Sequence, residues 1–187
     1  MTGDNTAQVN LGGQNLKIAN GSGTFSGVIA DGGEYNGTGG SLTIAGGIVT
    51  LAGANTYTGG STVTGGATLV GTSTSVQGNI VDNGSVVFAN PGTPGTYAGN
   101  MSGSGSVTLQ GNAAYTFNGS NSYTGGTTVT AGSSLTSTTA SVQGNLVNNG
   151  SVTSTRRATA PMLATCRVVA ALARPAAASP PSLAATA

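Results

Sequence analysis

A repeat inside the chain constrains its fold more than any other feature of the sequence. Residues 55–86 align without a gap onto residues 121–152, at an offset of 66 residues, and 21 of the 32 aligned positions are identical. Upstream, residues 41–44 match residues 106–109 one residue out of step. Such periodicity is typical of a solenoid, in which a repeat buries its apolar side chains by stacking on its neighbours.

Each repeat contains short β-branched stretches, which in the first copy are residues 61–64, 67–70, 79–81 and 85–89. Clusters of glycine, asparagine, threonine and serine separate them. Runs this short between Gly-rich corners predict strands and tight turns, and helical periodicity is absent before residue 153. We therefore expect an all-β chain that forms a parallel β-helix over about residues 16–152.

The 66-residue period divides into three coils of about 22 residues, each of which adds about 4.8 Å of length. On this division, Tyr57 and Tyr123, or Asn83 and Asn149, occupy equivalent positions three coils apart. Asparagine amides hydrogen-bond along such ladders and aromatic rings stack, while glycine and asparagine adopt the positive φ of sharp corners. Two alternatives stay open: these are ordinary turn and surface residues, or the Gly/Ser/Thr-rich chain is disordered.

The two copies resemble the autotransporter-associated β-strand repeat. Residues 55–63, NTYTGGSTV, and residues 121–129, NSYTGGTTV, follow the order of that family's motif, and glycine and leucine follow in both copies. The resemblance covers about residues 16–152. The structural repeat motif comprises Asn55, Tyr57, Gly59, Gly60, Val63, Leu69, Asn83 and Gly84 in the first copy, and Asn121, Tyr123, Gly125, Gly126, Val129, Leu135, Asn149 and Gly150 in the second.

The resemblance implies a right-handed, single-stranded parallel β-helix in the passenger of a Gram-negative autotransporter. Such repeats form stalks that assist passenger folding and export and present a surface or adhesin region. The implied partners are the neighbouring coils, the outer-membrane translocation machinery, and a host surface or another passenger. The implied location is the cell surface, extracellular or at the outer membrane. Because we recognise neither an export signal nor a translocating barrel, the chain is expected to be a fragment.

The side-chain chemistry argues against an enzyme. There is no histidine, and the single cysteine is Cys166, so the usual catalytic triads and most zinc sites are excluded. We expect no catalytic residues, no metal and no cofactor. Of the four carboxylates, only Asp31 and Glu34 are close in sequence, and we interpret them as solvated turn residues; the others are Asp4 and Asp82.

Composition argues against nucleic-acid binding, and one alternative to a stalk stays open. Lys17 is the only basic residue before residue 156, so the clustered positive charge that nucleic acid requires is missing and no nucleic-acid partner is expected. The alternative to a stalk is the inert scaffold portion of a carbohydrate-active parallel β-helix enzyme, a lyase or glycosidase, whose active coils lie outside this chain.

The composition changes abruptly after residue 152. All 33 glycines lie at or before residue 150, whereas residues 153–187 are rich in alanine, arginine and proline. We therefore divide the chain into β-helix repeats, residues 1–152, with units of about 37–102 and 103–152, and a tail, residues 153–187, that is disordered, poorly packed or partly helical.

The tail has a specific explanation in the genetic code. Codons permitted for residues 153–170, regrouped in a shifted frame, can encode FDQAGDGTYAGNLSGSG, which resembles GTYAGNMSGSG at residues 95–105. We therefore hypothesise that the tail is an out-of-frame translation of the next coil. The alternative is a genuine Ala/Pro-rich linker.

Overall fold

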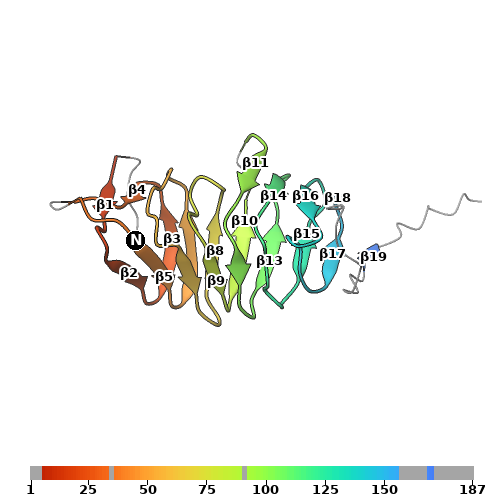
Figure 1. Ribbon diagram of the computed structural model, residues 1–187, viewed down its shortest axis with the longest axis horizontal. Coiled ribbons are helices and arrows are strands. Elements are labelled where there is room, and N and C mark those ends of the chain that lie inside the picture. The colour runs from red at the N-terminus through yellow and green to blue at the C-terminus, as the bar shows by residue number, and fades with distance from the viewer. Residues whose placement is uncertain (1–5, 34–35, 90–91, 156–167, 171–187) are drawn as a thin grey trace, which may run out of the picture.

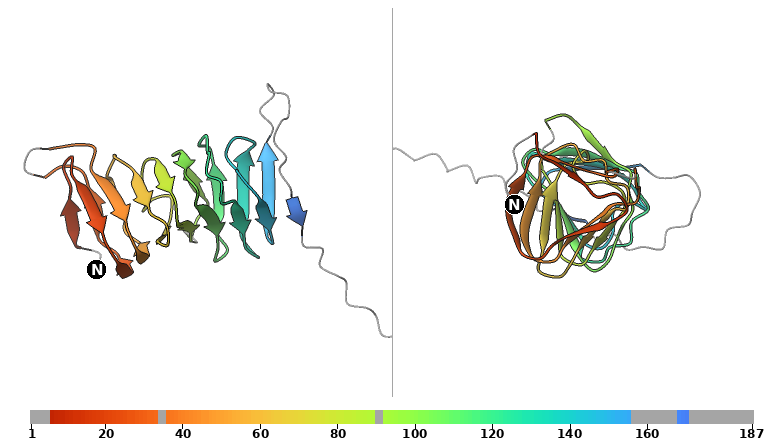
Figure 2. Two further views of the ribbon diagram at one scale, coloured as in Figure 1. Left: turned by 90° about the horizontal axis from the view of Figure 1, so that it is seen from below. Right: turned by 90° about the vertical axis from the view of Figure 1, so that its left-hand side faces the viewer.

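The computed structural model describes residues 6–33, 36–89, 92–155 and 168–170. These residues form strands and no helix, and the strands wind into a parallel β-solenoid of about seven turns. The turns follow one another along a rod (Figure 1), and viewed along the rod they wind around one common axis (Figure 2). The expected parallel β-helix is confirmed for this part of the chain, and the disordered alternative is wrong there.

A complete turn passes through three faces, which we name first, second and third in chain order; β9, β10 and β11 make one such turn. The first face consists of β2 (Asn15–Ile18), β5 (Ser41–Ile44), β7 (Ser61–Val63), β9 (Ile80–Asp82) and β12 (Met101–Ser102). The second consists of β3 (Gly21–Phe25), β6 (Gly47–Leu51), β8 (Thr68–Gly71), β10 (Ser85–Phe88), β13 (Ser106–Leu109), β15 (Thr127–Val129), β17 (Leu146–Asn148) and β19 (Val168–Ala170). The third consists of β11 (Gly95–Tyr97), β14 (Ala114–Phe117), β16 (Ser134–Thr138) and β18 (Ser151–Thr155).

A short pair of strands begins the third face at the N-terminal end. There β1 (Gln8–Asn10) pairs in parallel with β4 (Val28–Ala30), and a single bridge from Ala30 to Thr56 continues the pairing into the next turn. The third face is therefore present from the first turns onward, although its strands form a continuous sheet only from β11 onward.

The core forms because side chains alternate along each strand, so that every second residue points inward. In β5, β10, β13 and β14, the second and fourth residues are buried and the first and third are only partly buried. The buried residues are mostly Val, Leu, Ile and Phe, stacked in columns from one turn to the next. One continuous hydrophobic cluster therefore runs along the described coils.

Four aromatic side chains form a cluster inside the coils between the two repeat copies. The ring of Phe88 lies 5.2 Å from that of Tyr97, 5.1 Å from that of Tyr115 and 5.2 Å from that of Phe117 between centroids, all in tilted arrangements. These distances are in the range of favourable aromatic pairs. The aromatic stacking thus involves these rings rather than the Tyr57–Tyr123 ladder expected from the sequence.

The turns differ in length, which corrects the predicted division of the repeat. Residues paired in successive turns are separated by as few as 17 positions, between Thr68 and Ser85, and by as many as 26, between Gly21 and Gly47. Three coils of about 22 residues each are therefore wrong. In the first copy β7 lies on the first face and β8 on the second, whereas their counterparts β15 and β16 lie on the second and third faces.

The repeat period consequently equals three turns plus one face. On the first face, β9 lies one turn after β7 and β12 lies two turns after it. Ser122 lies three turns after β7, because its backbone N–H donates to the carbonyl of Met101 in β12. β15 follows one face later. The prediction that Asn55 and Asn121 are equivalent, three coils apart, is wrong, because the second copy is rotated by one face around the rod relative to the first.

Described strands continue past residue 152, after which we place the start of the tail. β18 pairs with β16 along its whole length, up to Thr155, and β19 pairs with β17 on the second face. Residues 156–167 and 171–187 lie outside the described part of the chain, so the boundaries of the tail and its frameshift origin stay predictions.

Candidate functional site

The most regular polar feature of the solenoid is a buried asparagine that appears in both repeat copies. The Asn55 side-chain oxygen accepts a hydrogen bond from the Ile29 backbone N–H (2.7 Å), and its Nδ2 donates to the Ser75 carbonyl (2.6 Å). Only 4% of Asn55 is exposed. Because Ile29 lies in the turn before Asn55 and Ser75 in the turn after, one amide joins three successive turns.

Asn121 makes the same pair of contacts in the second copy. Its side-chain oxygen accepts from the Met101 backbone N–H (2.8 Å), and its Nδ2 donates to the Ser141 carbonyl (2.6 Å). In each copy the carbonyl partner follows the asparagine by 20 residues. An asparagine amide satisfies one donor and one acceptor at once, which explains why a polar side chain is tolerated in this buried position.

A buried tyrosine follows each asparagine by two residues. Tyr57 and Tyr123 are both 1% exposed. The Tyr57 hydroxyl lies 2.8 Å from the Ser61 hydroxyl and accepts from the Gln77 backbone N–H, while the Tyr123 hydroxyl lies 2.6 Å from the Thr127 hydroxyl. Burial raises the pKa of both phenols above the usual 10, and these hydrogen bonds only partly oppose the shift. Both tyrosines are therefore neutral at physiological pH.

The Gly-Gly pair of each copy forms a corner that no other residue could form. A Cβ at Gly59 would lie 2.3 Å from the Gly39 carbonyl oxygen, and one at Gly125 would lie 2.5 Å from the Gly105 carbonyl oxygen. The second glycine of each pair, Gly60 or Gly126, has a φ of 81° or 89°. The first glycine allows close approach of two turns, and the second provides the positive φ.

The remaining motif residues also have matching surroundings. Val63 and Val129 are 0% exposed, and Leu69 and Leu135 are at most 1% exposed, all in the core. Asn83 and Asn149 each donate their backbone N–H to the carbonyl of the paired valine, at 2.8 Å in both copies. A Cβ at Gly84 would lie 2.3 Å from the Ala67 carbonyl, and one at Gly150 would lie 2.2 Å from the Ser133 carbonyl. We call residues 55–84 the first cassette and residues 121–150 the second cassette.

A second asparagine ladder, which the repeat alignment missed, runs along one corner. The Asn79 side-chain oxygen accepts from the Asn100 backbone N–H (2.9 Å), and the Asn100 oxygen accepts from the Ser120 backbone N–H (2.8 Å). Their spacings of 21 and 20 residues match one turn. That spacing was visible in the sequence, but the 66-residue alignment does not pair these residues with one another.

Asp31 is a partly exposed residue with a structural role. Its carboxylate accepts from the backbone N–H groups of Gly39, Gly40 and Thr58 and from the Thr58 hydroxyl. These bonds, the Thr58 side chain first, lower the pKa of Asp31 below 3.8, although partial desolvation opposes them. The carboxylate therefore links Gly39 and Gly40 to Thr58 in the next turn while it stays partly exposed to solvent, so the interpretation of Asp31 as a turn residue holds and these hydrogen bonds add a structural role to it. Glu34 and Asp4 lie outside the described residues.

Asp82, at the end of β9, has a different environment. It is 0% exposed, and one of its oxygens accepts from the Gly84 backbone N–H at 2.9 Å. The other oxygen, Oδ2, has no hydrogen-bond partner among the described residues. Burial raises the pKa of the Asp82 carboxyl to about 6, and the bond from Gly84 lowers it only in part.

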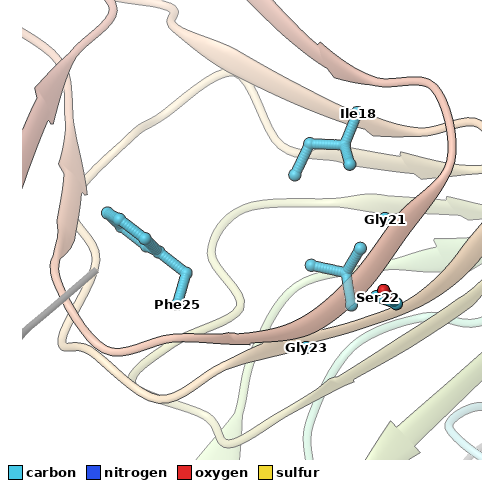
Figure 3. Close-up of a pocket in the computed structure, with 6 residues that line it drawn as sticks. Ile18, Gly21, Ser22, Gly23 and Phe25 are labelled. Atoms are coloured by element: carbon cyan, nitrogen blue, oxygen red, sulfur yellow. The ribbon is translucent and has the colours of Figure 1, made fainter. Parts of the chain in front are cut away.

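Two hollows of the described surface are small or shallow. Figure 3 shows one near the N-terminal end, which is lined by Ile18, Gly21, Ser22, Gly23, Phe25 and Val49. Its volume of about 10 Å³ is no more than one water molecule needs. A second, open groove crosses from the second face toward the third and is lined by Thr50, Leu51, Ala52, Gly71, Thr72, Thr74 and Ala89.

Neither a metal-binding cluster nor a membrane-spanning helix occurs among the described residues. Within residues 6–33, 36–89 and 92–155, no three His, Cys, Asp or Glu side chains are grouped so that they could hold a metal ion. The part of the chain that the structure describes has no helix long and apolar enough to cross a membrane.

Comparisons with family models, curated proteins and solved structures found no match to this chain.

Proposed function

We propose that this chain is a structural stalk segment of a Gram-negative autotransporter passenger, which assists passenger folding and export and presents a surface or adhesin region. The observation that supports this proposal is the buried asparagine that joins three successive turns, repeated in the two cassettes. Such a residue couples the folding of each turn to the turns on both sides. A rod assembled turn by turn through these contacts suits a chain that folds as it emerges from a membrane.

The stalk would lie at the cell surface, with the outer-membrane translocation machinery as its partner during export and a host surface or another passenger afterwards. Three described polar side chains hold turns together: Asp31 accepts four hydrogen bonds, and Asn55 and Asn121 each bridge two neighbouring turns. This arrangement favours a mechanical role over a chemical one.

The test places the full chain between an export signal and an outer-membrane translocator in a Gram-negative host. We expect the chain to reach the surface and to resist added protease as a folded fragment. The double variant Asn55→Ala/Asn121→Ala should be displayed less or digested faster, while Asn100→Ala, which loses one exposed hydrogen bond, serves as the matched control. Equal display and equal protease resistance of all three would contradict the proposal.

The alternative of an enzyme scaffold makes a different prediction. A catalytically inert scaffold portion of a carbohydrate-active β-helix would extend the polysaccharide path of the active coils along its own groove, without needing export through a translocator. Saturable binding of polygalacturonan by the purified chain, weakened by Thr72→Ala in the open groove, would favour the scaffold over the stalk.

A further inference from the structure

The two cassettes differ in charge at one position, which is buried in the first copy and half-buried in the second. Asp82 in the first cassette corresponds to Asn148 in the second. Both side chains accept a hydrogen bond from the glycine two residues later, Gly84 at 2.9 Å and Gly150 at 3.1 Å. The turn therefore needs only a side-chain oxygen at this position, which the neutral amide supplies as well as the carboxylate.

The surroundings of Asp82 are poorly suited to a negative charge. The next turn lies directly against the carboxyl group: a Cβ at Gly105 would be 2.3 Å from its carbon and 2.3 and 2.5 Å from its oxygens. The Gly105 backbone N–H donates to the Asp82 carbonyl (2.7 Å) rather than to its side chain. A buried carboxylate with an unpartnered oxygen costs free energy, because nothing replaces the water it has lost.

No neighbouring charge compensates for it within the described residues. β9 carries no other titratable side chain, nor do β7 or residues 103–105, the segments on either side of it. Among the described titratable groups, the phenol of Tyr123 interacts electrostatically with Asp82. Tyr123 is neutral between pH 5 and 8, because burial raises its pKa above 10. Lys17, the only basic residue described, lies on β2, three strands away along the first face.

We propose that Asp82 is a proton-operated switch in the middle of the solenoid: protonation tightens the packing of β9 against the turn at residues 103–105, and ionisation loosens it. The protonated carboxyl resembles the asparagine of the second cassette. The ionised carboxyl places an unpaired charge between two turns. The rod is then most cohesive in mildly acidic surroundings and weakest at this point when the pH is neutral or higher.

The sign of the effect follows from the titration. Burial raises the pKa of Asp82 to about 6, above the 3.8 of an exposed aspartate, so the folded chain holds the proton more tightly than the unfolded chain. The folded state therefore gains stability as the pH falls from 8 to 5 and loses it as the pH rises through 6. The unfolding equilibrium constant should fall by roughly tenfold between pH 8 and pH 5 because of this group alone.

The experiment measures denaturant unfolding of the full chain between pH 5 and 8, for the wild type and for Asp82→Asn. At pH 8 the variant should have an unfolding constant lower by on the order of 100-fold, and the difference should shrink to roughly tenfold at pH 5. Asp31→Asn is the control: its pKa is lowered, so it is ionised throughout this range and should leave the slope unchanged. Parallel pH profiles for wild type and Asp82→Asn would overturn the proposal.

Two local measurements keep the result specific to this site. Carboxyl-carbon NMR should give a pKa near 6 for Asp82, and a value near 4 would overturn the proposal independently of stability. Hydrogen exchange at the Gly84 and Gly105 amides, both bonded to Asp82, should be faster in the wild type than in Asp82→Asn at pH 8 and similar in the two at pH 5. Equal exchange in the two proteins at pH 8 would place any pH effect elsewhere and contradict the switch.

Discussion

The two cassettes have matching local structure and lie on different faces of the rod. Asn55 and Asn121 make the same pair of hydrogen bonds, and the glycine corners have matching geometry. Yet β7 belongs to the first face and β15 to the second. The repeated sequence therefore specifies a local unit of strand, corner and strand, and this unit forms on different faces of the solenoid where it pairs with a parallel neighbouring strand. Its position around the axis is set by the lengths of the turns between the copies.

The largest expected effect tests whether the two faces are energetically equivalent. Asn55→Ala leaves the Ile29 N–H and the Ser75 carbonyl without their buried partner, and Asn121→Ala does the same to the Met101 N–H and the Ser141 carbonyl. Each variant should lower the free energy of unfolding by about 3 kcal/mol, measured by denaturant titration. The two losses should agree closely if the cassette does not depend on its face.

A matched control separates this loss from the general effect of removing an asparagine. Asn100→Ala removes one hydrogen bond, to the Ser120 N–H, at an exposed position, and should cost about 1 kcal/mol. A cost at Asn55 more than twice that at Asn121 would show that the face matters. The comparison between the cassettes would then hold for geometry but not for energy.

The sequence predicted the strands well because inward–outward alternation is a local property. The expected strands at residues 61–64, 67–70, 79–81 and 85–89 correspond to β7, β8, β9 and β10 within about one residue at each end. The cassette asparagines, tyrosines and glycines were also found by repetition alone. Their individual roles, such as the close approach at Gly59, depend on which backbone lies in the adjoining turn.

Turn length could not be predicted in the same way. The turn that contains Asp31 and its hydrogen-bond partners Gly39 and Gly40 has a 26-residue spacing, whereas the turn that leads from β8 through β9 to β10 has a spacing of 17. Alternation shows where strands are but not how many residues each corner takes. An average of 22 residues therefore hid the rotation by one face, and with it the lack of equivalence between Asn55 and Asn121.

A smaller effect concerns the buried hydroxyls. Tyr57→Phe removes the contact with the Ser61 hydroxyl, and Tyr123→Phe removes the contact with the Thr127 hydroxyl. Each should lower the free energy of unfolding by about 1–2 kcal/mol, because the ring stays packed while its partner loses a buried hydrogen bond. Ser61→Thr, which introduces the residue of the second cassette, should be close to neutral. A loss for Ser61→Thr as large as that for Tyr57→Phe would mean that the two corners are not interchangeable.

The smallest effect is expected where the cassettes face solvent. Val81 and Val147 occupy the same position in the two copies and are 43% and 42% exposed. Val81→Thr and Val147→Thr keep the β-branched shape and should each change the free energy of unfolding by less than about 0.5 kcal/mol. The inward valines give the contrast: Val63→Thr and Val129→Thr bury a hydroxyl at 0% exposure and should each cost about 1–3 kcal/mol. If the outward pair proved as sensitive as the inward pair, the outer surface of the cassette would have to be covered in the folded protein. The repeat would then preserve its surface as well as its core.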